Sequence, residues 1–126
     1  DGRPLLLILR YPVMLQTDPL TRSRALDMIA DRLRDHFGEV LQTLYVLPEN
    51  PYEPAGDDEW IILAAVFDDA FHERDNAPQE ASAVGSAFEK EVDWHYVVTV
   101  FSLSVTEFET GETEVARVAR NRGVRL

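Results

Sequence analysis

A nearly unbroken apolar run, EWIILAAVF at residues 59–67, constrains the fold of this chain more than any other segment. A strand with one face in water alternates apolar and polar residues, whereas a strand covered on both faces is apolar throughout. The run has the length of a strand, and the acids Asp68 and Asp69 end it. It therefore predicts a central β-strand that is covered on both of its faces.

Other apolar segments predict further strands. Residues 40–47 (VLQTLYVL) and 96–105 (YVVTVFSLSV) are rich in β-branched and aromatic residues, which favour strands. The first apolar run, RPLLLILRYPVML at residues 3–15, has no helical periodicity. It predicts a strand that ends near Tyr11, because Pro12 lacks the N–H that a central ladder needs.

Three helices are expected between these strands. The first has Asp18 as its N-cap and ends at Gly38, where a left-handed residue is favoured. The second spans about residues 78–91 and follows an acidic loop, FHERDNAPQ. The third lies within TGETEVARVARNRG, from Thr110 as its cap to Gly123 as its stop.

The predicted order is β-α-β-β-α-β-α with a brief terminal edge strand. This order predicts an α+β fold, a mixed sheet with helices mainly on one face. A chain of 126 residues suits one domain that buries about two thirds of its unfolded surface. Residues 1–17 are expected to form an N-terminal strand extension and residues 18–126 the core.

The charge of the chain is strongly biased. It has 23 Asp and Glu against 12 Lys and Arg, a formal net charge of −11, and Lys90 is its one lysine. In molar salt a screening length of about 3 Å removes most repulsion between carboxylates, which also hold hydrated cations at the surface. The composition resembles that of cytosolic proteins from halophilic archaea that accumulate salt. An acidic mesophilic protein from a GC-rich genome, where arginine codons displace lysine codons, is the alternative.

Composition also excludes several classes of function. The chain has no cysteine, which excludes disulfides, thiolate nucleophiles and cysteine-based metal sites. No stretch approaches the ~20 apolar residues of a membrane span, and the LLLIL run lacks the flanks of a signal peptide. The acid excess disfavours nucleic acid. We therefore expect a soluble cytoplasmic protein without a membrane or nucleic-acid partner, with cations at its surface in high salt.

The loop between two of the predicted strands, LPENPYEPAGDDEWII at residues 47–62, is long and acidic. Asp57, Asp58 and Glu59 are candidate ligands for a hard cation such as Ca²⁺ or Mg²⁺, although their spacing matches no EF-hand. The alternative is a solvated acidic loop.

The same loop holds a candidate contact site for a protein partner or for a second copy of the chain. Tyr52 lies beside prolines and is expected to be exposed, and aromatic side chains are enriched at protein interfaces. The candidate contact residues are Tyr52, Glu53 and Pro54.

No residue pattern assigns a catalytic group or a cofactor. The three histidines lie in separate segments without a metal-binding spacing, and no serine lies in a G-x-S-x-G motif. The six glycines are scattered singly, so a glycine-rich phosphate loop is absent. Trp60 and Phe101 are expected to pack in the core.

From about Leu26 to Leu126 the chain resembles a minimal nucleotidyltransferase domain. The resemblance lies in the order of the segments and in two local motifs, SVTEFE at residues 104–109 and RNRGVRL at residues 120–126. That family runs helix, strand, loop, strand, helix, strand, then an acidic turn, a short helix and a closing Gly-Val-x-Leu.

The resemblance also implies where catalytic groups would lie. The family carries Gly-Ser after its first strand, Asp-x-Asp at the next, and a third carboxylate on the strand after that, and these acids hold Mg²⁺ on a triphosphate. In this chain Gly-Ser falls at Pro48 and Glu49, Asp-x-Asp at Trp60 and Ile62, and the third carboxylate near Thr99. The resemblance therefore implies a domain that has lost nucleotidyl transfer and acts through binding, as a regulatory or antitoxin-like partner.

The predicted strand at the N-terminus leaves a second fold open. Counted with that strand, β-α-β-β-α-β is also the ferredoxin-like arrangement, which often serves as a ligand-binding or oligomerisation module. In that alternative, residues 5–9 form a central strand between 59–67 and 40–47.

Overall fold

The computed structural model describes residues 20–53 and 59–126. The predicted N-terminal strand, and with it the extension at residues 1–17, lies outside these residues. Pro54, Asp57 and Asp58 lie outside them as well.

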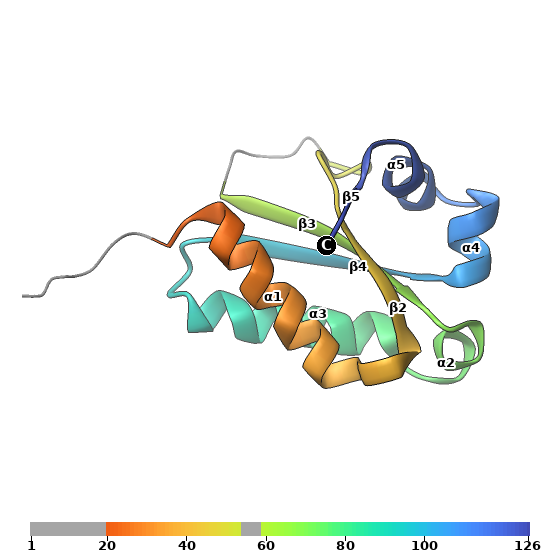
Figure 1. Ribbon diagram of the computed structural model, residues 1–126, viewed down its shortest axis with the longest axis horizontal. Coiled ribbons are helices and arrows are strands. Elements are labelled where there is room, and N and C mark those ends of the chain that lie inside the picture. Colours follow the sequence, from red (N-terminus) through yellow and green to blue (C-terminus); the bar gives the residue numbers. More distant parts are fainter. Residues whose placement is uncertain (1–19, 54–58) are drawn as a thin grey trace, which may run out of the picture.

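The described part of the chain contains one four-stranded mixed sheet, in the order β4-β3-β2-β5 (Figure 1). Strand β3 (Trp60–Phe67) pairs antiparallel with β2 (Leu41–Val46) and parallel with β4 (Val97–Ser104). The short β5 (Val124–Arg125) pairs antiparallel with β2 at the edge. The predicted central position of the apolar run and the predicted terminal edge strand are both confirmed.

Helices cover both faces of β3. Its residues Ile61 and Leu63 pack in one apolar cluster with α1 (Arg22–Phe37) and α3 (Ala77–Glu91). Its residue Ile62 packs in a second cluster. That cluster is shared with two shorter helices, α4 (Val105–Thr110) and α5 (Glu114–Arg122).

The prediction of helices mainly on one face is therefore only partly right. The two long helices do share a face, and they lie side by side along it (Figure 1). The C-terminal helices close the other face, because the apolar side chains of β3 alternate and those that point away from α1 also need cover. The α+β class itself is confirmed.

Helix α1 begins later than predicted. Its N-cap is Thr21, whose side-chain oxygen accepts a hydrogen bond from the Arg24 N–H at 3.2 Å. Asp18 is therefore not the N-cap, because a hydroxyl closer to the helical stretch satisfies the free N–H groups. The predicted end is right, since Gly38 follows the helix with a φ of 63°.

Two other predictions need correction. The loop predicted at FHERDNAPQ contains a short helix, α2 (Asp69–Arg74), because the Asp68 side chain accepts the Phe71 N–H and caps it. The helix predicted within residues 110–123 corresponds to α5, but an additional short helix, α4, precedes it and ends where Gly111 adopts a left-handed conformation.

Each of these two C-terminal helices is capped by side chains from its own first turn or from the residue just before it. Ser104 and Glu107 form a capping box at the start of α4, and Thr113 rather than Thr110 caps α5. Gly123 ends α5 as predicted.

The ferredoxin-like alternative does not fit the sheet. Strands β2 and β3 pair directly, with Val46 opposite Leu63, so no strand lies between them. Strands β3 and β4 also pair directly, with Ile62 opposite Thr99. A central position for residues 5–9 is therefore wrong.

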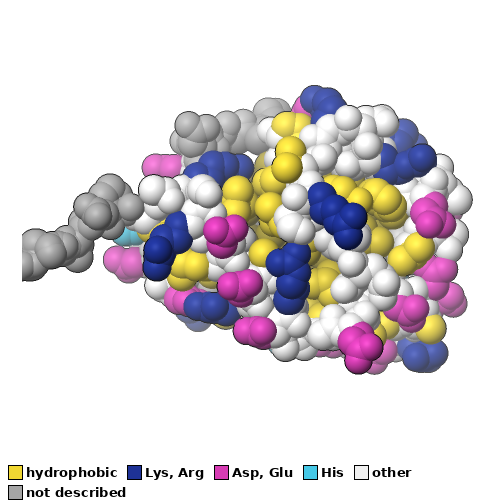
Figure 2. All heavy atoms as spheres, in the orientation of Figure 1, with side chains coloured by type: hydrophobic (Ala, Val, Ile, Leu, Met, Phe, Trp, Pro, Cys, Tyr) yellow, Lys and Arg dark blue, Asp and Glu magenta, His cyan; other side chains and the backbone are white. Residues whose placement is uncertain are grey.

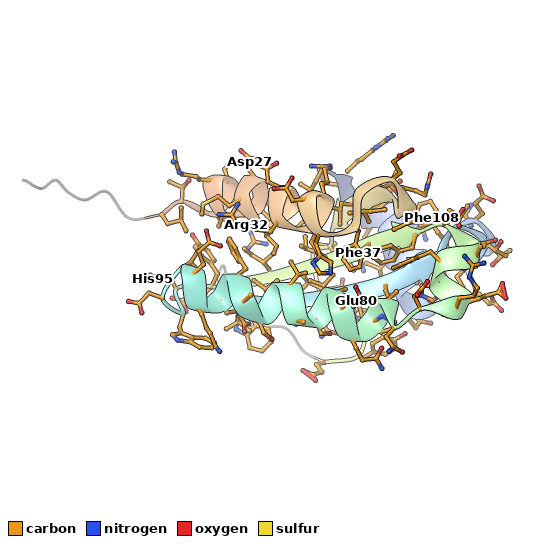
Figure 3. The ribbon with its side chains drawn as sticks, turned by 90° about the horizontal axis from the view of Figure 1, so that it is seen from below. Asp27, Arg32, Phe37, Glu80, His95 and Phe108 are labelled. Carbon is orange, nitrogen blue, oxygen red and sulfur yellow. The ribbon has the colours of Figure 1, made fainter. Side chains whose placement is uncertain are left out.

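The surface carries an acidic stripe on α1. Asp27, Asp31 and Asp35 are exposed at four-residue spacing, and Figure 3 shows Asp27 pointing away from α3. Arg32 points toward α3 instead, where it forms an ion pair with Glu91 that lowers the pKa of that carboxyl group. Figure 2 shows acidic side chains along α1 and around the opposite end of the molecule, with cationic side chains between them.

Candidate functional site

Three strand ends meet at one end of the sheet, and they carry the positions that the sequence singled out. The chain leaves β2 at Leu47, whose N–H donates to the Ile62 carbonyl at 2.8 Å. In the parallel pair, Trp60 lies opposite Val97 and Ile62 lies opposite Thr99. The segments after β2, at the start of β3 and at the start of β4 are therefore neighbours in space.

The chemistry at these neighbouring positions is mostly apolar. Ile62 is buried, with 3% of its surface exposed, and belongs to the apolar cluster under α5. Trp60 is half-buried, and its carbonyl accepts a hydrogen bond from the Arg22 guanidinium at 2.7 Å. Thr99 offers a hydroxyl group, which carries no charge. These three side chains offer no carboxylate to a metal ion.

At this end of the sheet, the acid Glu49 forms an ion pair with Arg122. Its Oε1 lies 2.5 Å from a guanidinium nitrogen of Arg122, at the end of α5, and both side chains are about half exposed. The ion pair ties the segment after β2 to the C-terminal helix. A carboxylate here also opposes an incoming phosphate group electrostatically.

The first part of the long loop is held against the sheet. Asn50 is buried, and its side-chain oxygen accepts the Tyr52 N–H at 2.9 Å. The Tyr52 ring then lies edge-on to Phe101 of β4, with ring centroids 5.8 Å apart. Tyr52 nevertheless leaves 59% of its surface exposed, so its predicted exposure is confirmed.

Of the remaining candidate residues in the loop, some lie within the described part of the chain and some lie outside it. Glu53 and Glu59 are exposed, and the Glu59 carbonyl accepts the Val97 N–H at 2.8 Å. Pro54, Asp57 and Asp58 lie outside residues 20–53 and 59–126. In those two ranges no group of three His, Asp or Glu side chains is arranged to hold a metal ion.

Along the middle of the outer strand, a hollow of about 570 Å³ lies between α3 and β4. Pro78, Ser82 and Ser86 line it from α3, at four-residue spacing along one side of the helix. Residues 98–102 of β4 line the other side, including Phe101, the residue that Tyr52 contacts.

The hollow was not predicted from the sequence. Its signal in the sequence is the small size of Pro78, Ser82 and Ser86, but their significance depends on the position of α3 beside β4. Phe101, expected in the core, is only half-buried because it lies on the outer strand of the sheet.

The histidines remain apart in the structure. His36 Nε2 lies 3.1 Å from a Glu80 carboxylate oxygen, and His95 Nδ1 lies 3.0 Å from the Val92 carbonyl oxygen. His72 is mostly buried between Phe67 and Glu107. No two of the three share a site.

No family model, curated protein or solved structure matches this chain. None of the helices within residues 20–53 and 59–126 is both long and apolar enough to cross a membrane.

Proposed function

We propose that this chain is a nucleotidyltransferase-like domain that has lost catalysis and works through binding, as a regulatory or antitoxin-like partner in a high-salt cytosol. The supporting observation is that several positions singled out by the resemblance lie close together in space. Positions that the resemblance assigns to a Gly-Ser turn and to three carboxylates are distant in sequence, yet they meet at one end of the sheet.

The order of the elements agrees with this proposal. A long helix, α1, precedes the antiparallel pair β2 and β3, and α3 leads into β4, as in the family pattern. The acidic turn falls at α4 and the closing Gly-Val-x-Leu at β5. The extra helix α2 has no counterpart in that pattern.

The residues at that end of the sheet favour binding over catalysis. A two-metal site needs carboxylates on neighbouring strands, whereas Trp60, Ile62 and Thr99 provide none. Glu49 replaces a group that would cradle phosphate, and it is already paired with Arg122.

Tyr52 provides the contact surface in this proposal. It is exposed, yet the Asn50 hydrogen bond and the Phe101 ring hold it in place, so little conformational entropy is lost when a partner covers it. Glu53 beside it is exposed and acidic, which favours a partner protein with a cationic surface.

Site-specific photo-crosslinking tests the binding function. A benzophenone amino acid replaces Tyr52, and the protein is produced and crosslinked inside cells of its natural host. The matched control carries the same group at Trp94, which is 60% exposed, against 59% for Tyr52, and which follows α3 rather than β2. We expect a discrete protein adduct from position 52 and none from position 94. Equal labelling at both positions, or none at either, would contradict the proposal.

A second candidate function is self-association, as an oligomerisation module. It is favoured by the outer position of β4, since a strand at the edge of a sheet presents unpaired backbone groups. Light scattering in molar KCl tests it through the molar mass. A mass of one chain at all protein concentrations would exclude this function.

A further inference from the structure

The outer edge of β4 has a defined pattern of hydrogen bonds. The Val97 N–H donates to Glu59 on the β3 side at 2.8 Å, so the N–H groups of the odd-numbered residues of β4 point toward β3. Those of the even-numbered residues point outward. The Val98 N–H agrees with this pattern, because it donates to the Glu89 carboxylate of α3 at 2.8 Å.

At both ends of this edge the outward-pointing N–H group already donates to a carboxylate. At the far end the Ser104 N–H donates to the Glu107 carboxylate at 2.9 Å. Between the two carboxylates, the N–H groups of Val100 and Ser102 also point outward, and neither has a hydrogen-bond partner among residues 20–53 and 59–126. The middle of β4 is therefore open to pairing with another strand.

The hollow beside this edge gives an added strand room for its side chains. It has a volume of about 570 Å³ and is walled on the α3 side by Pro78, Ser82 and Ser86. Helix α3 approaches the strand closely at Gly85, where an added Cβ would lie 3.4 Å from a Val100 methyl carbon. Beside this contact, the hollow extends along Val100 and Ser102, where the α3 side is formed by Pro78, Ser82 and Ser86.

The chain enters the described fold next to the start of this edge. The Tyr96 hydroxyl, one residue before β4, donates to the Leu20 carbonyl at 2.8 Å. Figure 1 shows the start of α1 and the turn before β4 at the same end of the molecule. Leu20 and the start of β4 are therefore neighbours in space.

We propose that residues 5–11 (LLLILRY) pair with the outer edge of β4, antiparallel to it. The segment is apolar and lies between Pro4 and Pro12. Seven residues span about 23 Å, nearly the length of the eight-residue β4. The eight residues 12–19 reach up to about 26 Å, which is ample to connect Tyr11 to Leu20.

The antiparallel direction follows from the position of Leu20 and from charge. It places Tyr11 at the start of β4, so the connection to Leu20 is short. It also places Arg10 near the start of β4, where the Glu89 carboxylate lies. This inference rests on the edge geometry and does not depend on the proposed loss of nucleotidyl transfer.

Amide hydrogen exchange, measured by NMR on the full chain, tests the pairing. Two variants, Leu7→Pro and Ile8→Pro, each remove one N–H from the segment. Because successive N–H groups point in opposite directions, one of the two must face β4. Val13→Pro is the control, since it lies outside the paired segment.

We expect slow exchange at Val100 and Ser102 in the unmodified chain and in Val13→Pro. At least one of the other variants should exchange faster at both amides, by about tenfold or more. The amides of Phe101 and Leu103 should stay slow in every variant, because they face β3. If protein concentration changes the protection that the proline variants abolish, the segment comes from a neighbouring chain, and the pairing still stands.

Two results would overturn the proposal. In the first, Val100 and Ser102 exchange fast in the unmodified chain, which means that nothing pairs with the edge. In the second, both amides are protected equally in Leu7→Pro and Ile8→Pro, which means that a second copy of β4 or another protein covers the edge instead.

Discussion

The Glu49 carboxylate and the Arg122 guanidinium lie 2.5 Å apart and join the segment after β2 to the end of α5. The two residues are far apart in the sequence, and each flanks a strand at the same side of the sheet. In the proposed relationship, their ion pair occupies the place where a nucleotidyltransferase would hold phosphate.

Removing this ion pair should have a small effect on stability. Both side chains are about half exposed, so water and salt screen the attraction and Glu49→Gln should lower the free energy of unfolding by less than about 1 kcal/mol. Chemical denaturation measures this value, with the exposed Glu53→Gln as the control. A loss of several kcal/mol would show that the pair fixes α5 in place.

A substitution in the apolar core should lower the free energy of unfolding far more than loss of this ion pair does. Leu63 is completely buried in the centre of β3, so Leu63→Ala should lower the free energy of unfolding by about 2–5 kcal/mol. The control, Val97→Ala, lies at the exposed start of β4 and should cost less than about 1 kcal/mol. Equal losses for the two variants would contradict the assignment of β3 as the central strand.

The sequence predicted this central strand well, because nine successive mostly apolar residues have few alternatives. It did not predict α4, because residues 105–110 directly follow the predicted strand and owe their helical start to the capping box of Ser104 and Glu107. It also missed α2, which has six residues and owes its start to the Asp68 cap. Short helices depend on caps and tertiary contacts more than on periodicity.

The candidate site was predictable in part. The exposure of Tyr52 followed from its neighbouring prolines, whereas its contact with Phe101 did not, because that contact joins a loop to a strand that is distant in the sequence. The hollow between α3 and β4 was not predictable, since Ser82 and Ser86 acquire their meaning only beside β4.

Asp69 should make stability depend on pH in the acid range. Hydrogen bonds from the Thr106 hydroxyl and backbone N–H lower the pKa of Asp69 below its ordinary value of 3.8. A lowered pKa in the folded state means that this stabilisation is complete above about pH 5 and is lost as the pH falls through the folded pKa.

Acid unfolding curves measure this contribution. Asp69→Asn should weaken the fall in stability below about pH 5, whereas Asp75→Asn, which changes an exposed acid after α2, should leave it unchanged. If stability falls equally with decreasing pH in Asp69→Asn and in the unmodified protein, the role assigned to Thr106 is contradicted.

The acidic stripe on α1 should make stability rise with salt. Asp27, Asp31 and Asp35 repel one another at four-residue spacing, and salt screens this repulsion. The midpoint of thermal unfolding should therefore move to a higher temperature between about 0.1 M and about 2 M KCl.

The matched variant neutralises the stripe as Asp27→Asn, Asp31→Asn and Asp35→Asn together. Each like-charge pair costs about 0.2–0.5 kcal/mol, so the triple variant should be more stable in low salt and should gain less from added KCl. Full stability of the unmodified protein in low salt would count against a halophilic origin.

Titration of the full chain with Mg-ATP in molar KCl tests the proposed loss of nucleotidyl transfer directly. NMR follows the amides of Glu49, Ile62 and Thr99, and mass spectrometry follows transfer of AMP to the protein. The proposed loss of catalysis predicts no saturable shift of these amides and no adduct. A saturable shift with covalent attachment of AMP and release of pyrophosphate would contradict it.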